Sequence, residues 1–403
     1  MNKARGLPPA GRFALAAALC SSIGQTFFIG LFGAEFRAEF GLSQSALGAL
    51  YGAATLASGM MMFWLGSIAD DWPMRRAIVL TIAGLAGGAA LVGSAPSLVV
   101  LIGGLFLIRL CGQGLCGHLA VVAAARYAQR RRGRAIAMVT YGFIIGEALF
   151  PFLVALAMER TDWRVIWLGS GALMLVVALP VMALLAGPLG RHRVDESAAF
   201  EGDSPPPRIR RLGLFRHGGF LRVLGVVLVP PVVVTAIFLH QGTLAERLGR
   251  AIGDVASGFI LYALIQGLFA YAGGWLVDRF SARALLRFSL LPAGLGLLSL
   301  SLITPQLGLW LLFAGVGMTA GLNSVISGAV WVELFGTAQL GMIRGVYAAL
   351  MVVSTALGPV GLGLLFDQDV SLRSMAVVYL AYAVVVPLLL VPGIRGFASP
   401  NYS

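Results

Sequence analysis

The chain alternates long apolar stretches with short polar ones from one end to the other. A membrane-spanning helix needs about 20 mostly apolar residues, and the apolar stretches reach that length. The pattern predicts twelve such helices, at about 13–34, 47–67, 76–95, 98–122, 135–157, 164–187, 221–241, 255–276, 283–303, 307–330, 342–365 and 373–394. The sequence therefore predicts an all-α integral membrane protein.

One polar stretch near the middle of the chain is longer and more highly charged than the others. Residues 188–219 hold several arginines and acidic residues together with Pro205, Pro206 and Pro207. Such a composition cannot enter a bilayer and predicts a flexible linker. The linker divides the chain into a six-helix half at 1–187 and a second six-helix half at 220–403.

A short charged segment occurs twice, at matching places in the two halves. The first copy starts at Gly66 and contains Asp70, and the second starts at Gly274 and contains Asp278, 208 residues further along. Each copy joins the second helix of its half to the third and carries basic residues, namely Arg75, Arg76, Arg279 and Arg283. A segment repeated at this spacing predicts two structurally similar halves.

The order of these residues, a Gly, then an Asp four positions on, then an Arg, resembles the loop signature of the major facilitator superfamily. The first copy departs from that signature at Asp71, where an Arg is common, and at Pro73. The resemblance implies two pseudo-symmetric six-helix bundles that transport a small molecule by alternating access, with no catalytic centre and no cofactor.

The resemblance also implies that the two charged segments form a cytoplasmic gate. Asp70 would bind the end of helix 11 near Arg344, and Asp278 would bind the end of helix 5 near Arg134. A carboxylate is favoured at the positive N-terminus of a facing helix. The alternative is that both segments are only turns whose charges set the topology.

The composition agrees with a membrane protein and explains the net charge. Only 11% of the 403 residues are charged and 59% are hydrophobic, whereas a soluble domain carries about 25% charged residues. Most Lys and Arg residues fall on the side that carries both termini and the linker, which predicts that this side is cytoplasmic. The net charge of +12 is then explained by topology and anionic lipid headgroups, without nucleic acid.

Two charged side chains are predicted deep inside spans, Arg109 in helix 4 and Glu147 in helix 5. Such charges are costly and mark functional sites. At the spacing of an α-helix, Gln113 and Cys116 share the face of Arg109. Two interpretations stay open: an Arg109–Glu147 pair in a central cavity that substrate or a proton breaks, or a permanent structural ion pair.

Other polar residues lie at mid-span, and each alone is more typical of a hydrogen bond between helices. They are Gln25 in helix 1, Tyr262 and Gln266 in helix 8, and Asn323 in helix 10. Helices 1, 4, 7 and 10 line the cavity in the family that the chain resembles, so Gln25 and Asn323 rank first among them.

Small residues and prolines mark predicted points of close packing or bending. Gly66 and Gly274 would let helices approach at the gate. Helix 5 partly resembles the glycine-rich, proline-containing motif of antiporters in the family, and helix 11 carries a similar pair; the residues are Gly142, Gly146, Pro151, Gly358 and Pro359. Simple packing through small residues explains the same pattern.

These observations favour a monomeric secondary transporter in the cytoplasmic (inner) membrane, driven most simply by protons. The one deep cation, Arg109, indicates a small organic anion as substrate. The alternative is a proton-driven efflux pump for drugs, with Glu147 as the acid that binds them. A sensor would need a sizeable soluble domain, and an enzyme would need paired catalytic groups at one depth.

The three cysteines, which lie in apolar stretches, predict neither a disulfide framework nor a metal site.

Overall fold

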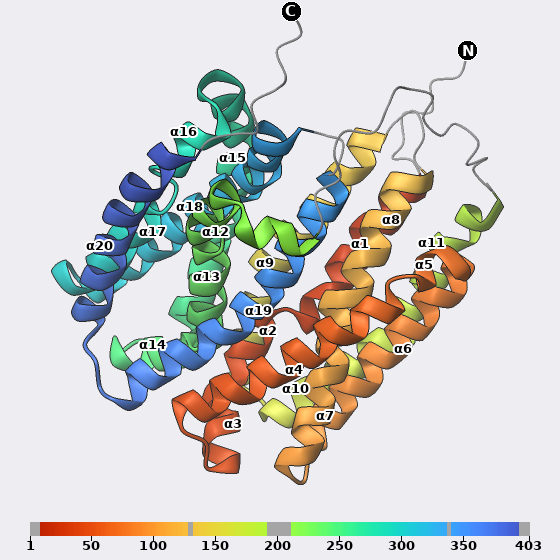
Figure 1. The fold of residues 1–403 in the computed structure, drawn as a ribbon. Helices are drawn as coiled ribbons and strands as arrows, with labels where there is room; N and C mark the ends of the chain where they lie inside the picture. Colours follow the sequence, from red (N-terminus) through yellow and green to blue (C-terminus); the bar gives the residue numbers. More distant parts are fainter. Residues whose placement is uncertain (1–8, 128–131, 192–210, 337–339, 395–403) are drawn as a thin grey trace, which may run out of the picture. The chain divides into compact units, whose positions relative to one another are not determined.

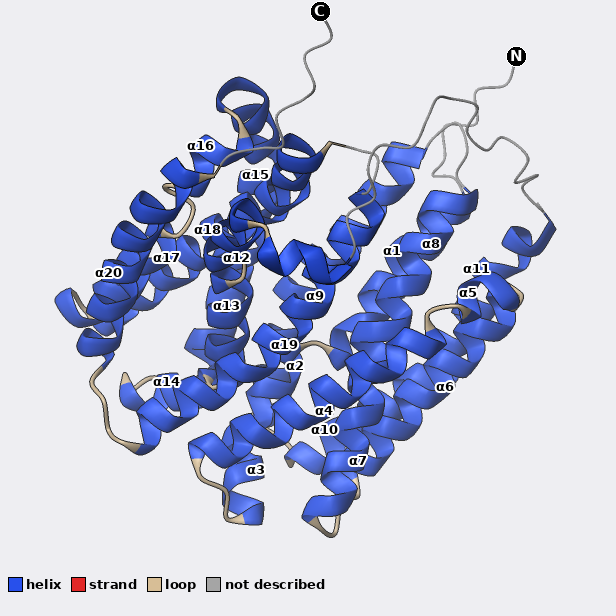
Figure 2. Ribbon diagram, in the orientation of Figure 1, coloured by secondary structure: helices blue, strands red, loops and turns tan. Residues whose placement is uncertain are grey.

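The computed structural model of the chain describes residues 9–127, 132–191, 211–336 and 340–394, and these residues contain helices and no strand (Figure 2). Twelve helical segments are long and apolar enough to cross a membrane. The chain divides into two compact units, Met1–Phe200 and Glu201–Ser403, with six of these spans in each. The predicted all-α fold with twelve spans is confirmed.

The first unit holds spans one to six, coloured red to yellow-green in Figure 1. Three of its spans are assembled from several helical pieces, and a short helix follows the second span. In chain order the elements are α1 (Pro9–Cys20), α2 (Thr26–Ile29), α3 (Gly33–Phe40), α4 (Gln44–Leu65), α5 (Ile68–Asp71), α6 (Met74–Gly93), α7 (Leu98–Ile108), α8 (Gly117–Tyr127), α9 (Arg132–Met158), α10 (Trp163–Leu173) and α11 (Leu179–Ala186).

The second unit holds spans seven to twelve, coloured green to blue in Figure 1. Its elements are α12 (Gly218–Val227), α13 (Val229–Leu239), α14 (Gln241–Arg247), α15 (Ile252–Phe280), α16 (Ala282–Leu286), α17 (Leu291–Leu302), α18 (Pro305–Phe335), α19 (Leu340–Asp367) and α20 (Leu372–Leu390). Most of the predicted linker, residues 192–210, lies outside the described residues. The largest difference from the predicted boundaries within this unit is at α18, which continues past 330 to Phe335.

The backbone repeats itself at the spacing of the two charged segments. Gly41 follows α3 and Gly249 follows α14, each just before the second span of its unit, and both adopt a left-handed conformation with φ of 62° and 61°. Only glycine adopts positive φ at little cost. The next helix begins after Ser43 in one unit and after Ala251 in the other. Both pairs are 208 residues apart, so the duplication extends to the turns.

Aromatic side chains fill the space between the first, fifth and sixth spans of the first unit. The ring centroid of Phe28 lies 5.1 Å from that of Trp167, and the centroid of Phe36 lies 5.3 Å from that of Trp163. Tilted and edge-on pairs at such distances add to the free energy gained by burial. The cluster has six members: Phe28, Phe32, Phe36, Phe150, Trp163 and Trp167.

We expect Phe32→Ala to destabilise the protein, because Phe32 is fully buried and contacts three rings of this aromatic cluster. Truncation of a core Phe typically costs about 3–5 kcal/mol. The melting temperature in detergent should fall by several degrees, whereas the control Leu389→Ala, at a side chain 72% exposed, should change it little. Equal melting temperatures for the two variants would contradict a packing role for the cluster.

Candidate functional site

The first span is interrupted in its middle. Helix α1 ends at Cys20, a 3₁₀ turn follows, and Gln25 is extended, with φ −87° and ψ 155°. In a continuous helix the Phe28 N–H would bond the Gly24 carbonyl, but here it bonds the Gln25 carbonyl at 3.1 Å. The Gly24 carbonyl is thus left without the partner that a continuous helix would supply.

The side chain of Arg109 supplies a partner for that carbonyl. Its Nη1 donates a hydrogen bond to the Gly24 oxygen at 3.0 Å, and the side chain is only 1% exposed. The guanidinium carbon lies 4.9 Å from the centre of the Tyr51 ring, and the Tyr51 hydroxyl shares a hydrogen bond with Thr26 Oγ1. A carbonyl and an aromatic face both stabilise a cation in an apolar setting. Arg109 therefore connects the first, second and fourth spans.

Two glycines allow the first and fourth spans to cross at this point. A Cβ placed on Gly24 would lie 2.3 Å from the Ile108 carbonyl oxygen and 2.7 Å from the Cα of Gly112. A Cβ on Gly112 would lie 2.7 Å from the Cα of Gly24. Neither position accepts a larger residue without separating the two spans, so the bond from Arg109 depends on both glycines.

The fourth span changes its winding at the same place. Residues Arg109–Cys116 form a π-helix, in which hydrogen bonds run from i to i+5. Arg109 and Cys116 are buried, but Gln113 is exposed. The three side chains predicted to share one face therefore differ in exposure, and their common orientation stays a prediction.

Glu147 lies on α9, where this helix packs against the interrupted first span. A Cβ on Gly146 would lie 2.0 Å from Ser22 Oγ, which shows how closely the two helices approach. Glu147 Oε2 and Ser22 Oγ are both enclosed, and neither has a hydrogen-bond partner within the described ranges. These ranges also contain no ion pair between Glu147 and Arg109. The predicted pair is not formed, because Arg109 binds a backbone carbonyl instead.

The second unit has a comparable arrangement at its first span. Pro231 has no N–H, so the Val227 carbonyl, four residues earlier, loses its helical partner between α12 and α13. Asn323 Nδ2, on the tenth span, donates to that carbonyl at 3.4 Å. In each unit, a polar side chain from the fourth helix of the unit satisfies a carbonyl at an interruption in the first.

The other predicted cavity residues have local partners or apolar surroundings. Gln25 Nε2 donates to Ser21 Oγ at 3.5 Å, within the first span. Tyr262 is 2% exposed and lies against aromatic rings, while Gln266 Oε1 is buried with no hydrogen-bond partner within the described ranges. No group of three or more His, Cys, Asp or Glu residues in the described part of the chain could hold a metal ion.

The fourth span holds the first charged segment through two side chains that the sequence did not indicate. His118 Nε2 lies 3.0 Å from the Gly66 carbonyl oxygen, to which it donates, and Arg126 Nη1 donates to the Ala69 carbonyl at 2.8 Å. The side chains of Asp70 and Arg134 lie outside the described residues. The segment itself is thus fastened to the first unit, and its predicted gate contact stays a prediction.

The tenth span holds the second charged segment through a hydrogen-bond acceptor, whereas the fourth span holds the first segment through donors. The Glu333 carboxylate accepts the backbone N–H groups of Ala282 and Arg283 at 2.5 and 3.2 Å, at the start of α16. It also lies 3.8 Å from Arg283 Nε. The remaining charged residues of the predicted gate are exposed: Arg75, Arg76, Asp278, Arg279 and Arg344.

The predicted packing glycines differ in their surroundings. A Cβ on Gly142 would lie 2.5 Å from the Leu15 carbonyl oxygen, and one on Gly358 would lie 2.5 Å from the Val232 carbonyl oxygen. A Cβ on Gly274 would meet no heavy atom within 4 Å, so the close approach expected there is not seen. Pro151 and Pro359 lie inside α9 and α19.

Comparison with known families and structures gives a consistent result. The family model described as Major Facilitator Superfamily matches residues 14–249 and 232–400. The class H tetracycline resistance protein of Pasteurella multocida is 30% identical over 155 residues, which are 36% of this chain and 35% of that protein. The chain thus matches about a third of the length of this curated relative.

Solved structures resemble the fold over nearly the whole chain at low identity. The nucleoside transporter NupG gives a TM-score of 0.72 at 12% identity, covering 95% of this chain and 98% of NupG. The inward-open xylose transporter XylE from E. coli gives a TM-score of 0.67 at 16% identity, covering 97% of each chain. Both comparisons support the fold and leave the substrate open.

We expect Gly112→Ala to lower the melting temperature by several degrees, because the added Cβ would separate the first and fourth spans and break the bond from Arg109. The matched control is Gly103→Ala on α7, where a Cβ meets no heavy atom within 4 Å. Replacing an exposed helical glycine by alanine usually stabilises by about 0.5–1 kcal/mol, so the control should melt at or above the wild-type temperature. If Gly112→Ala behaves like the control, the crossing does not depend on glycine.

Proposed function

Because this chain belongs to the major facilitator superfamily, we propose that it is a proton-coupled secondary transporter that moves a small molecule across the cytoplasmic membrane by alternating access. The chain is a multi-pass membrane transporter and not an enzyme. The observation that carries the proposal of proton coupling is Glu147, whose Oε2 is enclosed with no hydrogen-bond partner within the described residues.

Glu147 is proposed as the group that gains and loses the coupled proton. A carboxylate without a partner is costly inside a membrane protein, so its protonation changes when its surroundings change. The neighbouring residue, Gly146, packs against Ser22 at the interrupted part of the first span. A change of charge on Glu147 would therefore act where that span is least regular.

Arg109 is proposed as a positioning residue. Its guanidinium is buried and already bound to the Gly24 carbonyl and the Tyr51 ring. The small organic anion predicted from the sequence could bind Arg109 only if the guanidinium left the Gly24 carbonyl. We therefore propose that the partly exposed Gln25 and the exposed Gln113, which directly follow Gly24 and Gly112, contact the substrate.

A second candidate function is proton-driven efflux of a drug. The similarity to a tetracycline resistance protein favours it, although that similarity spans about a third of each chain. Glu147 would then alternate between a proton and a cationic group of the drug. Lower accumulation of tetracycline in cells that express the protein, restored by Glu147→Gln, is the result that supports this direction of transport.

The charged segments are proposed to form the cytoplasmic gate, with both termini on the cytoplasmic side and a monomer as the working unit. The fourth span fixes the first segment through His118 and Arg126, and the tenth fixes the second through Glu333. A segment held on one side can present its remaining carboxylate, Asp70 or Asp278, to a facing helix N-terminus.

We expect Glu147→Gln to remove proton coupling while leaving the protein folded. In proteoliposomes that contain a pH-sensitive dye, a substrate found by thermal-shift screening should drive proton movement with the wild type and not with the variant. Tetracycline, nucleosides and xylose are the first probes. The control is Glu159→Gln, an exposed acid that follows α9, which should behave as wild type. Transport by Glu147→Gln with an unchanged pH dependence would exclude coupling through this residue.

We expect Asp70→Asn to insert normally and to transport more slowly, because the gate would lose the charge that binds a helix N-terminus. The neighbouring exposed acid gives the control, Asp71→Asn, which should retain the wild-type rate. Initial rates in the same proteoliposomes measure both. A wild-type rate for Asp70→Asn would leave the first segment as a turn with no gating role.

A further inference from the structure

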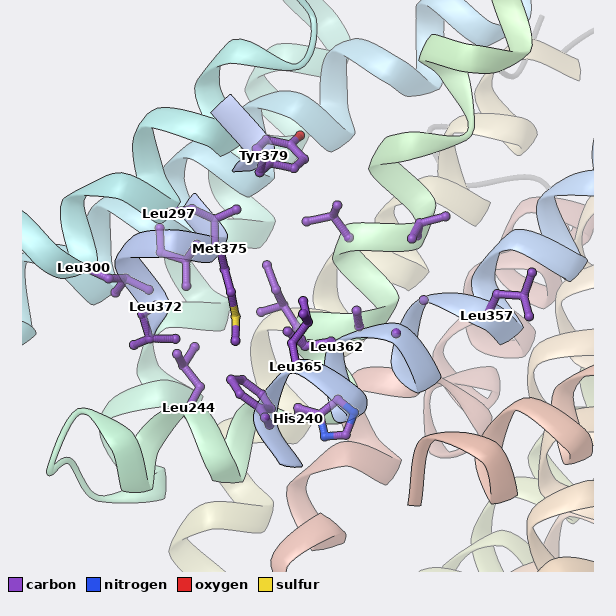
Figure 3. Close-up of a pocket in the computed structure, with 18 residues that line it drawn as sticks. His240, Leu244, Leu297, Leu300, Leu357, Leu362, Leu365, Leu372, Met375 and Tyr379 are labelled. Atoms are coloured by element: carbon purple, nitrogen blue, oxygen red, sulfur yellow. The ribbon is translucent and has the colours of Figure 1, made fainter. Parts of the chain in front are cut away.

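The second unit contains an apolar cavity of about 350 Å³. Side chains from α13, α14, α17, α18, α19 and α20 line it. In Figure 3, Leu297, Leu300 and Leu372 approach the cavity from one side, and Leu362 and Leu365 approach it from the other. Its volume falls within the range of about 300–1,000 Å³ that is typical of small-molecule sites.

The polar side chains in the cavity wall are already bound within the protein. His240 Nε2 donates to the Pro359 carbonyl at 2.9 Å, and the Tyr379 hydroxyl donates to the Leu290 carbonyl at 3.4 Å. The other lining side chains are Val, Ala, Ile, Leu, Phe and Met. The cavity therefore offers hydrocarbon surface and suits an apolar ligand.

Because the two units are duplicated, the residues around this cavity can be compared with the residues at matching positions in the first unit. Pro151 and Pro359 keep the spacing of 208 residues, as Gly41 and Gly249 do. The sixth and twelfth spans start after the N-caps Asp162 and Ser371, a spacing of 209. These markers align the two units, residue by residue, in the first, fifth and sixth spans of each.

The cavity lies where the first unit has its aromatic cluster. Each of the six cluster residues has a smaller or less bulky counterpart in the second unit. In the order Phe28, Phe32, Phe36, Phe150, Trp163 and Trp167, the counterparts are Ala236, His240, Leu244, Gly358, Leu372 and Ala376. The first five counterparts line the cavity. The second unit therefore keeps the helices of the duplication and lacks the rings that fill the space between them.

The cavity continues to the apolar outer face of α20. A second hollow shares Leu365, Met375 and Tyr379 with it and extends to Val378 and Tyr382, which are 70% and 37% exposed. Only 17% of the most apolar stretch of α20 is buried, the lowest share among the twelve spans. An exposed apolar face of this kind is covered by lipid chains in a bilayer.

We propose that the cavity binds one hydrocarbon chain of a membrane lipid, which enters along α20. An apolar space of this size leaves its lining without van der Waals partners when empty, and a hydrocarbon chain restores those contacts. The neighbouring bilayer supplies such chains at the mouth of the cavity. The proposal does not depend on the identity of the transported substrate or on proton coupling.

The test uses the full chain in proteoliposomes with a phosphatidylcholine that carries a photoactivatable group in one acyl chain. After illumination and digestion, we expect cross-links in residues 357–366 and 372–379 at a higher yield than in the mostly exposed stretch 384–389 of α20. Ala236→Phe restores one ring of the aromatic cluster and should reduce the yield in the lining peptides to that of the exposed stretch. The control Leu264→Phe, at a side chain on α15 that is 64% exposed and outside the cavity wall, should leave the yield in the lining peptides unchanged.

A second filled variant keeps the test decisive if Ala236→Phe does not fold. A Cβ on Gly361, which lines the cavity, would meet no heavy atom within 4 Å, so Gly361→Leu adds a side chain where there is room. It should also lower the yield in the lining peptides. Lining peptides that react no more than residues 384–389 in the wild type would overturn the proposal. If both variants fold and their lining peptides still react with the wild-type yield, the proposal is also overturned. Displacement of the label by tetracycline would assign the cavity to a drug instead and would also overturn it.

Discussion

A backbone carbonyl inside a bilayer needs a hydrogen-bond partner from the protein, and the first unit is organised around one such requirement. The interruption of the first span frees the Gly24 carbonyl, and Arg109 binds it. This bond requires the close crossing that Gly24 and Gly112 permit, and it occurs where the fourth span changes to π-helical winding. The second unit meets the same requirement with a neutral amide, Asn323, at a break that a proline causes.

The twelve spans and the duplication could be predicted from the sequence, because apolar length and a repeated charged segment are properties of the chain alone. Arg109 and Glu147 were also identifiable, since charges are rare inside spans. Their lack of pairing could not be predicted, because the partner of Arg109 is a carbonyl freed by a break that contains no proline. The π-helix from Arg109 to Cys116 had no recognisable signal in the sequence either.

The two charged segments are fastened with opposite chemistry. His118 and Arg126 donate to carbonyls at Gly66 and Ala69, whereas Glu333 accepts N–H groups at the start of α16. Each type of side chain matches the backbone groups that lack a partner within the helix, since the start of a helix has unpaired N–H groups and the end has unpaired carbonyls. The fourth span of each unit thus holds the charged segment of that unit, but at different backbone groups and through different side chains.

The unequal filling of the duplicated helices has a mechanical consequence. Hydrostatic pressure favours states that eliminate internal void volume. In the first unit, six aromatic rings pack between the first, fifth and sixth spans, while the second unit has a cavity of about 350 Å³ between the corresponding helices. We therefore expect the two units to differ in compressibility, with the second unit, whose cavity opens toward the hydrocarbon phase, as the softer one.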